Sequence, residues 1–158
     1  MIEIERIEDQ LRRSLDGEAW HGPALRELLV DVTAEEAAAK PLANAHSIWE
    51  IVLHIISAQR LVSERLKGKP TVLAAEEDWP TIPEESAAAW STTIQELHDT
   101  NERLRQAVLQ LGDARLDKPI VEGFSSIYVT LHGTVQHNLY HGGQIAVLKK
   151  ALRANLTE

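Results

Sequence analysis

Four long segments of this chain carry apolar residues at intervals of three and four positions. That spacing places side chains on one face of a helix. The segments run from about Ile2 to Leu15, Ser47 to Leu66, Glu84 to Leu111 and about Ser126 to Leu152. Aromatic residues make up only 4% of the chain, which favours helices over strands. We therefore predict an all-α protein, a four-helix bundle with short extra helices, forming a single domain over residues 1–158.

Capping and turn residues predict where the helices begin and end. Thr33 with Glu36 and Ser47 with Glu50 each form a capping-box pattern. Pro23 is placed to open a short helix through Val30. The proline-rich stretch from Thr71 to Pro83 is expected to be a long ordered crossover loop. The β-branched residues around Ile120–Val121 and Ile127–Val129 resemble a hairpin, but a loop and a helix entry capped by Ser125–Ser126 are preferred.

The composition excludes several classes of function. The formal net charge is −8, whereas binding to nucleic acid or to an anionic membrane surface needs a basic footprint. The chain has no cysteine, so disulfides, thiolate zinc sites and a cysteine nucleophile are ruled out. The acidic start lacks a signal-peptide core, and no apolar run approaches the roughly 18 residues of a membrane span. A cytoplasmic protein with no membrane partner is expected.

Three histidines form the most informative pattern. His137 and His141 are four positions apart in the last segment, on the apolar stripe that continues through Ile145 and Leu148. His54 lies inside the second strongly apolar segment. Three neutral imidazoles with an open fourth position are typical ligands of a catalytic divalent metal. Nitrogen ligands suit zinc, nickel or iron better than magnesium or calcium.

Each of these residues also has a purely structural interpretation. The histidines can be buried, hydrogen-bonded core residues, and Gly142–Gly143 can serve either close helix packing or space beside a pocket. Glu50 is either a helix cap or a base near His54. Gln144, one turn after His141, can orient that ring or bind a substrate, or it is simply a polar helix residue. Three residues in irregular segments are further candidates for a pocket: Trp20, His21 and Trp79.

Three stretches of the sequence resemble the DinB-like superfamily of metalloenzymes, and within it the YfiT-like branch. They are Trp20–Pro23, Ser47–Ile55, and the His137-x-x-x-His141-Gly-Gly-Gln-Ile pattern. The resemblance implies an up-down-down-up four-helix bundle, commonly a homodimer. It also implies one divalent metal, nickel or zinc, held by His54, His137 and His141.

Characterised members of that superfamily include transferases that move a low-molecular-weight thiol onto an electrophile, and a thiol-dependent isomerase. The resemblance therefore implies a metal-dependent enzyme acting on a small-molecule substrate, with a small thiol as cosubstrate. Hydrolysis by an activated water is equally compatible with the residues. Two other classes stay open: a non-catalytic metal- or ligand-binding stress-response bundle, and a structural dimer with hydrogen-bonded core histidines.

Overall fold

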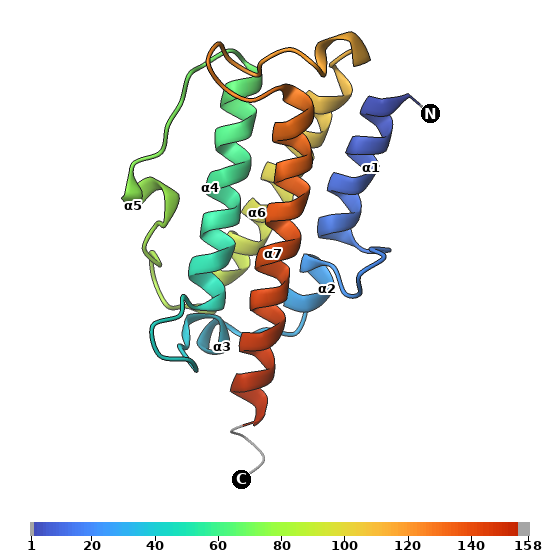
Figure 1. Ribbon diagram of the computed structural model, residues 1–158. Coiled ribbons are helices and arrows are strands. Elements are labelled where there is room, and N and C mark those ends of the chain that lie inside the picture. Colours follow the sequence, from blue (N-terminus) through green and yellow to red (C-terminus); the bar gives the residue numbers. More distant parts are fainter. Residues whose placement is uncertain (1, 155–158) are drawn as a thin grey trace.

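The computed structural model describes residues 2–154, which form a bundle of four long helices (Figure 1). These helices are α1 (Glu3–Asp16), α4 (Ile48–Leu66), α6 (Ala87–Leu109) and α7 (Ile127–Ala154). Among the described residues there is no strand, and the only β-type pairing is an isolated bridge between Pro119 and Ser126. The prediction of an all-α bundle without a hairpin is confirmed.

The long helices follow the up-down-down-up order. In Figure 1, α1 and α7 run downward, whereas α4 and α6 run upward and are joined by the long crossover. Helix α4 packs against α6 and α7, and α1 packs against the same two helices. Helices α4 and α7, which carry the three histidines, are therefore direct neighbours.

Short helices close the lower end of the bundle in Figure 1. They are α2 (Leu25–Leu29) and α3 (Ala34–Ala38). Both predicted capping boxes form: the Thr33 hydroxyl accepts a hydrogen bond from Glu36 N at 3.2 Å, and Ser47 accepts from Glu50 N at 3.2 Å. The prediction that Pro23 opens α2 was wrong by two positions. The helix begins at Leu25 because the Glu27 carboxylate accepts the free N–H of Ala24 at 2.8 Å.

The crossover between α4 and α6 and the start of α6 differ from the sequence-based expectation. The segment from Thr71 to Pro83 is not a loop throughout, because it contains α5 (Ala75–Asp78). This single turn forms where Glu77 accepts a hydrogen bond from Ala74 N at 2.9 Å. Helix α6 begins at Ala87 rather than Glu84, since Ser86 caps it through Ala89 N at 3.2 Å.

The second connection contains the short 3₁₀ helix η1 (Asp113–Arg115) and then leads into α7. The Ser126 hydroxyl accepts a hydrogen bond from Val129 N at 3.2 Å. This is the predicted loop and helix entry, with α7 itself beginning at Ile127.

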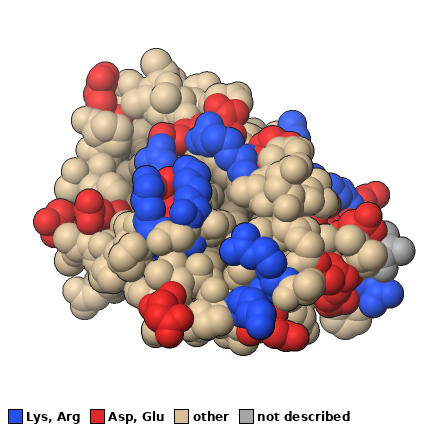
Figure 2. Space-filling view, turned by 90° about the horizontal axis from the view of Figure 1, so that it is seen from above, with Lys and Arg blue, Asp and Glu red and all other residues tan. Residues whose placement is uncertain are grey.

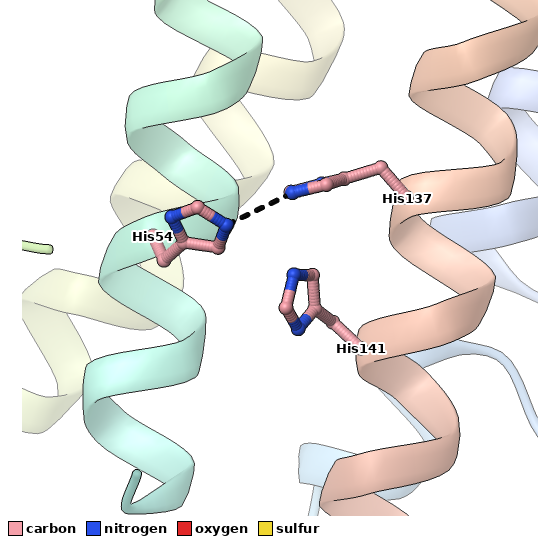
Figure 3. Close-up of side chains that lie close together, drawn as sticks. All are labelled: His54, His137 and His141. Carbon is pink, nitrogen blue, oxygen red and sulfur yellow. Dashed lines mark hydrogen bonds between the residues drawn. The ribbon is translucent and has the colours of Figure 1, made fainter. Parts of the chain in front are cut away.

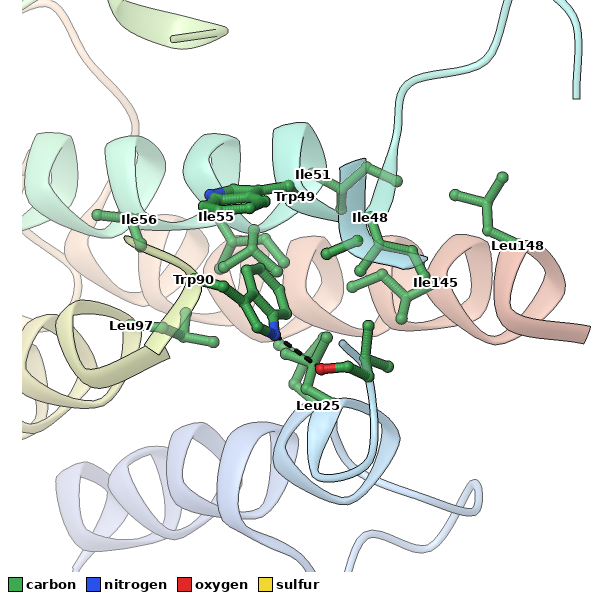
Figure 4. Close-up of a cluster of buried hydrophobic side chains, with 14 of the residues drawn as sticks. Leu25, Ile48, Trp49, Ile51, Ile55, Ile56, Trp90, Leu97, Ile145 and Leu148 are labelled. Atoms are coloured by element: carbon green, nitrogen blue, oxygen red, sulfur yellow. Dashed lines mark hydrogen bonds between the residues drawn. The ribbon is translucent and has the colours of Figure 1, made fainter. Parts of the chain in front are cut away.

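Buried apolar residues form two clusters, one toward each end of the bundle. In the cluster beside the short helices, Trp90 donates its indole N–H to the carbonyl of Val32 at 2.8 Å (Figure 4). Trp49 donates to the Thr93 hydroxyl at 3.0 Å. Both indoles are almost fully buried in this cluster. These hydrogen bonds satisfy polar atoms that burial would otherwise leave unpaired.

A buried polar contact fixes how α7 sits against α1 and α4. Asn138 donates its amide to the Ser14 hydroxyl at 2.9 Å and accepts from the Gln59 amide at 3.4 Å. All three side chains are almost fully buried. Because a rotation of α7 would leave these amides unpaired in an apolar interior, the contact specifies the orientation of the adjacent His137.

Charges of both signs are mixed at the end of the bundle seen from above (Figure 2). Just beyond this end of α4, Lys67 and Lys69 both pair with Glu64 and lower the pKa of its carboxyl to about 2. In residues 2–154, no helix combines the length and the apolar character needed to cross a bilayer.

Candidate metal centre

Three imidazole rings from α4 and α7 converge in the lower half of the bundle. His54 on α4 points toward His137 and His141 on α7 (Figure 3). The Nε2 atoms of His54 and His137 are 3.0 Å apart, and one nitrogen from each of the three rings lies within 4.8 Å of the others. His54 and His141 are buried, and His137 is partly buried. The structure thus brings together the three predicted ligands.

The His54 ring is held from behind by the end of α5. Its Nδ1 lies 2.8 Å from the backbone carbonyl oxygen of Asp78 and 3.1 Å from that residue's carboxylate. A carbonyl oxygen only accepts hydrogen bonds, so the Nδ1 of His54 carries the proton. The lone pair of a neutral His54 is therefore on Nε2, the atom that faces His137.

Trp79 covers the outer face of His54. The two rings are parallel, with an interplanar angle of 1° and centroids 4.0 Å apart. The opposite face of the indole stacks on His46 at 3.7 Å. Trp79, a sequence-predicted pocket residue, thus lies between two imidazoles and restricts the rotation of His54.

The His141 ring is oriented by its own helix. Its Nδ1 lies 2.6 Å from the Gln144 side-chain oxygen, which accepts the Nδ1 proton. This leaves Nε2 as the nitrogen with a lone pair. Gln144 thus makes the orienting contact that was one of its three possible roles, and Tyr140 adds an edge contact at a centroid distance of 5.1 Å.

The environment keeps the two α7 histidines neutral. Burial, followed by the neighbouring His141 and His54, lowers the pKa of His137 to about 4. Burial also lowers the pKa of His141, and the hydrogen bond that its Nδ1 donates to Gln144 opposes this only in part. Near neutral pH both rings are unprotonated, which is the form that binds metal ions.

The arrangement fits a divalent transition metal. Two imidazole nitrogens bound to one ion at about 2.0–2.1 Å lie roughly 3–3.5 Å from each other. The separation of 3.0 Å between His54 and His137 matches this, and the 4.8 Å limit leaves His141 within reach after a small ring movement. A set of three neutral nitrogens leaves further coordination positions for a small molecule.

Other predicted site residues lie elsewhere. Glu50 accepts hydrogen bonds from Ser47 N at 2.7 Å and from Lys40 at 2.9 Å, so its carboxylate is engaged at the start of α4. Trp20 is fully exposed because the turn after α1 directs its side chain into solvent. His21 is exposed and lines a cleft beside Gly142, away from the three rings.

The two glycines after His141 have different surroundings. A Cβ on Gly142 would meet Leu25 at 3.6 Å and Leu28 at 3.9 Å, which are ordinary van der Waals distances. A Cβ on Gly143 would meet nothing within 4 Å. Close helix packing therefore accounts for neither glycine.

Sequence reasoning missed two residues of this centre, Asp78 and His46. Asp78 was expected in a loop, and His46, which is exposed in the segment before α4, was not among the predicted site residues. No spacing rule relates the crossover to α4, so only the folded chain reveals these contacts.

The sequence also matches a known family. The family profile of the DinB superfamily matches residues 19–145, a range that contains His54, His137 and His141. No curated protein and no solved structure matches the chain. Since the profile covers most of the chain, this protein belongs to the DinB superfamily.

Proposed function

We propose that this protein is a metal-dependent enzyme in which His54, His137 and His141 hold one divalent transition-metal ion. Nickel and zinc fit the three imidazoles best, and iron is a further candidate. One observation carries the proposal: three ring nitrogens from two helices converge within 4.8 Å. When bound, the ion supplies the acidity that turns a small thiol or a water molecule into a nucleophile near neutral pH.

The surrounding residues hold the ligand nitrogens in place. Asp78 accepts the Nδ1 proton of His54, and Gln144 accepts that of His141, so both rings present Nε2 to the same region. Such outer contacts fix the tautomer of a metal-binding imidazole and its direction. Trp79 covers His54 and keeps bulk water from that face. Together these residues prepare the site before a ligand arrives.

The absence of cysteine determines where a thiol must come from. A thiol-transfer reaction in this protein needs a low-molecular-weight thiol as cosubstrate, since the chain supplies none. The second substrate is a small electrophile. Hydrolysis of that electrophile by an activated water is the alternative reaction of the same centre.

Metal analysis tests the ligand assignment. The protein is treated with chelator, dialysed, and titrated with Zn²⁺ and with Ni²⁺ by calorimetry. We expect one ion per chain, and loss of tight binding in His54→Ala, His137→Ala and His141→Ala. His98→Ala is a matched control, because this histidine lies on α6 beside Asp16. A further variant has all three histidines changed to alanine. Stoichiometric metal binding by that variant contradicts the assignment.

A turnover assay tests the enzymatic part. Glutathione and cysteine are offered with 1-chloro-2,4-dinitrobenzene to the metal-loaded and the chelator-treated protein. Turnover that requires the metal and His137 supports thiol transfer. Metal binding without turnover of the electrophile, with or without a thiol, favours the non-catalytic metal- or ligand-binding bundle. If the protein shows neither metal binding nor turnover, the result favours a structural cluster joined by the His54–His137 hydrogen bond.

A homodimer and a cytoplasmic location stay predictions within this proposal. The homodimer comes from the family resemblance, and analytical ultracentrifugation measures it directly. Cell fractionation tests the location.

A further inference from the structure

A cleft of about 530 Å³ opens beside the three imidazoles. Its walls come from the segment before α4, the first turn of α4 and one face of α7. Most of the lining residues are apolar: Leu42, Ala45, Ile51, Tyr140, Val147 and Leu148. Among the described residues that line it there is no aspartate, glutamate, lysine or arginine. The lining therefore offers little to compensate a buried charge.

Two polar residues of this cleft contact the imidazole cluster or the indole that covers it, and Asn44 is a further polar residue of the lining. Gln144 lines the cleft and accepts the proton of His141 Nδ1. His46 lines it as well, and stacks on the indole that covers His54. A molecule in the cleft would have its polar end near the histidines and its apolar body along α7.

The cleft also collects apolar side chains that the chain itself leaves uncovered. Leu42 is 43% exposed, Val147 is 56% exposed and Tyr140 is 67% exposed. Gly143 lies between them on α7, in open space. Glycine inside a helix costs about 1 kcal/mol relative to alanine, and no contact within this chain requires it here. A bare backbone at Gly143 keeps the cleft open.

A second cleft of about 600 Å³ lies on the other side of Gly143 and differs in charge. It is lined by Lys149, Lys150 and Arg153, together with Ala146 and Gly142. Lysine and arginine side chains suit a carboxylate or a phosphate group. The two clefts thus differ in the charged side chains that line them, although Lys149 and Arg153 already pair with Asp31.

We infer that the apolar cleft binds the electrophilic substrate, and that this substrate is an uncharged molecule with an aryl or alkyl body. The role of the ligand as the electrophile rests on the proposed function, and the link to that site is Gln144, which lines the cleft and contacts His141. The preference for an uncharged apolar ligand follows from the lining alone. The reactive group of the ligand lies toward Gln144 and His46, and Gly143 determines how large a body the cleft admits.

Two probes with the same ring system test the preference. Binding of 2-naphthamide, which is neutral, and of 2-naphthoate, which is anionic, is measured by calorimetry near pH 7. We expect the amide to bind at least about tenfold more tightly, a difference of about 1.4 kcal/mol. Equal or tighter binding of the carboxylate overturns the inference.

Neighbouring positions on α7 separate the two clefts. Val147 lines only the apolar cleft and Ala146 lines only the basic one, and each is partly or largely accessible to solvent. Val147→Asp should lower the affinity for 2-naphthamide at least about tenfold, since the new carboxylate must be desolvated when the probe binds. Ala146→Asp should leave that affinity within about twofold. The opposite pattern places the ligand in the basic cleft and overturns the inference.

Filling the cleft provides a second test. Gly143→Leu should abolish 2-naphthamide binding, whereas Gly133→Leu should not, although both positions on α7 have open space around a new Cβ. Each substitution raises helix propensity, so both variants should fold. Unchanged binding in Gly143→Leu contradicts the assignment.

His137→Ala separates this inference from the metal proposal. If 2-naphthamide still binds that variant while metal is lost, both stand. If the probe binds and no metal is taken up by the native protein, only the proposed function fails. If metal binds the native protein but the probe does not, only the substrate class fails.

Discussion

The Nε2 atoms of His54 and His137 lie 3.0 Å apart, although 83 positions separate the two residues in the chain. Asp78 accepts the Nδ1 proton of His54, so a neutral His54 has only a lone pair on Nε2. The proton in this contact therefore belongs to His137. If the proposed ion binds, His54 and His137 would hold it through these two nitrogens, and the proton of His137 would reside on its Nδ1. The same contact would thus be a hydrogen bond in the metal-free protein and a ligand pair in the proposed metal-bound form.

Removing the metal should lower thermal stability. A ligand that binds only the native state stabilises it by RT ln(1 + [L]/Kd), about 2.7 kcal/mol at a hundredfold excess over Kd. We expect chelator to lower the Tm of native protein purified with metal and to leave that of His137→Ala unchanged. Scanning calorimetry with and without added Zn²⁺ measures this. An identical Tm in both conditions contradicts a metal bound at the three histidines.

Gln144→Leu should weaken metal binding without unfolding α7. The leucine cannot accept the Nδ1 proton of His141, so that ring loses its fixed direction. Loss of such an outer contact typically costs about 10–100-fold in metal affinity. Gln136→Leu is the control, since Gln136 is exposed on the same helix. Competition with a chromogenic chelator gives both affinities, and an equal loss in the two variants argues against an orienting role.

Leu97→Ala should destabilise the bundle much more than Leu109→Ala. Both leucines are on α6, but Leu97 is 1% exposed and Leu109 is 39% exposed. Truncation of a buried leucine leaves a cavity and costs roughly 2–5 kcal/mol, and the exposed one should cost well under half of that. Urea unfolding followed by circular dichroism measures both free energies. Similar losses of unfolding free energy in the two variants would indicate that α6 is packed differently.

Asp31 should make the stability depend on pH in the acidic range. Hydrogen bonds from Lys149 and Arg153 of α7 lower the pKa of this carboxyl to about 2, from 3.8. Because the folded-state pKa is depressed, the stabilising contribution is complete above about pH 4 and disappears as the pH falls toward 2. Asp31→Asn should therefore be less stable than the native protein at about pH 5 and nearly equal to it near pH 2.

Denaturant midpoints at the two pH values measure that difference. Asp117→Asn is the control, because it removes an exposed carboxyl in the connection before α7. If the difference in denaturant midpoint between the native protein and Asp31→Asn is the same at both pH values, the ion-pair explanation is contradicted.

Sequence patterns within one or two helical turns were sufficient to predict the long helices. The three- and four-residue spacing of apolar side chains marked all four long helices, and the capping boxes at Thr33 and Ser47 marked two helix starts. These features depend on residues within one or two turns of each other. Errors occurred where a short turn formed on a single carboxylate contact, as with Glu77 in α5 and Glu27 in α2.

The sequence by itself determined the long helices of this protein and the face that each helix buries, because both follow from residues a few positions apart. It also placed His137 and His141 on one stripe, since a helix turn brings them together. Only the tertiary structure decided that His54 faces them, that Asp78 and Trp79 hold His54, and that a neutral cleft opens at Gly143. Those relations join segments far apart in the chain, and the packing of α7 between α1 and α4 sets them.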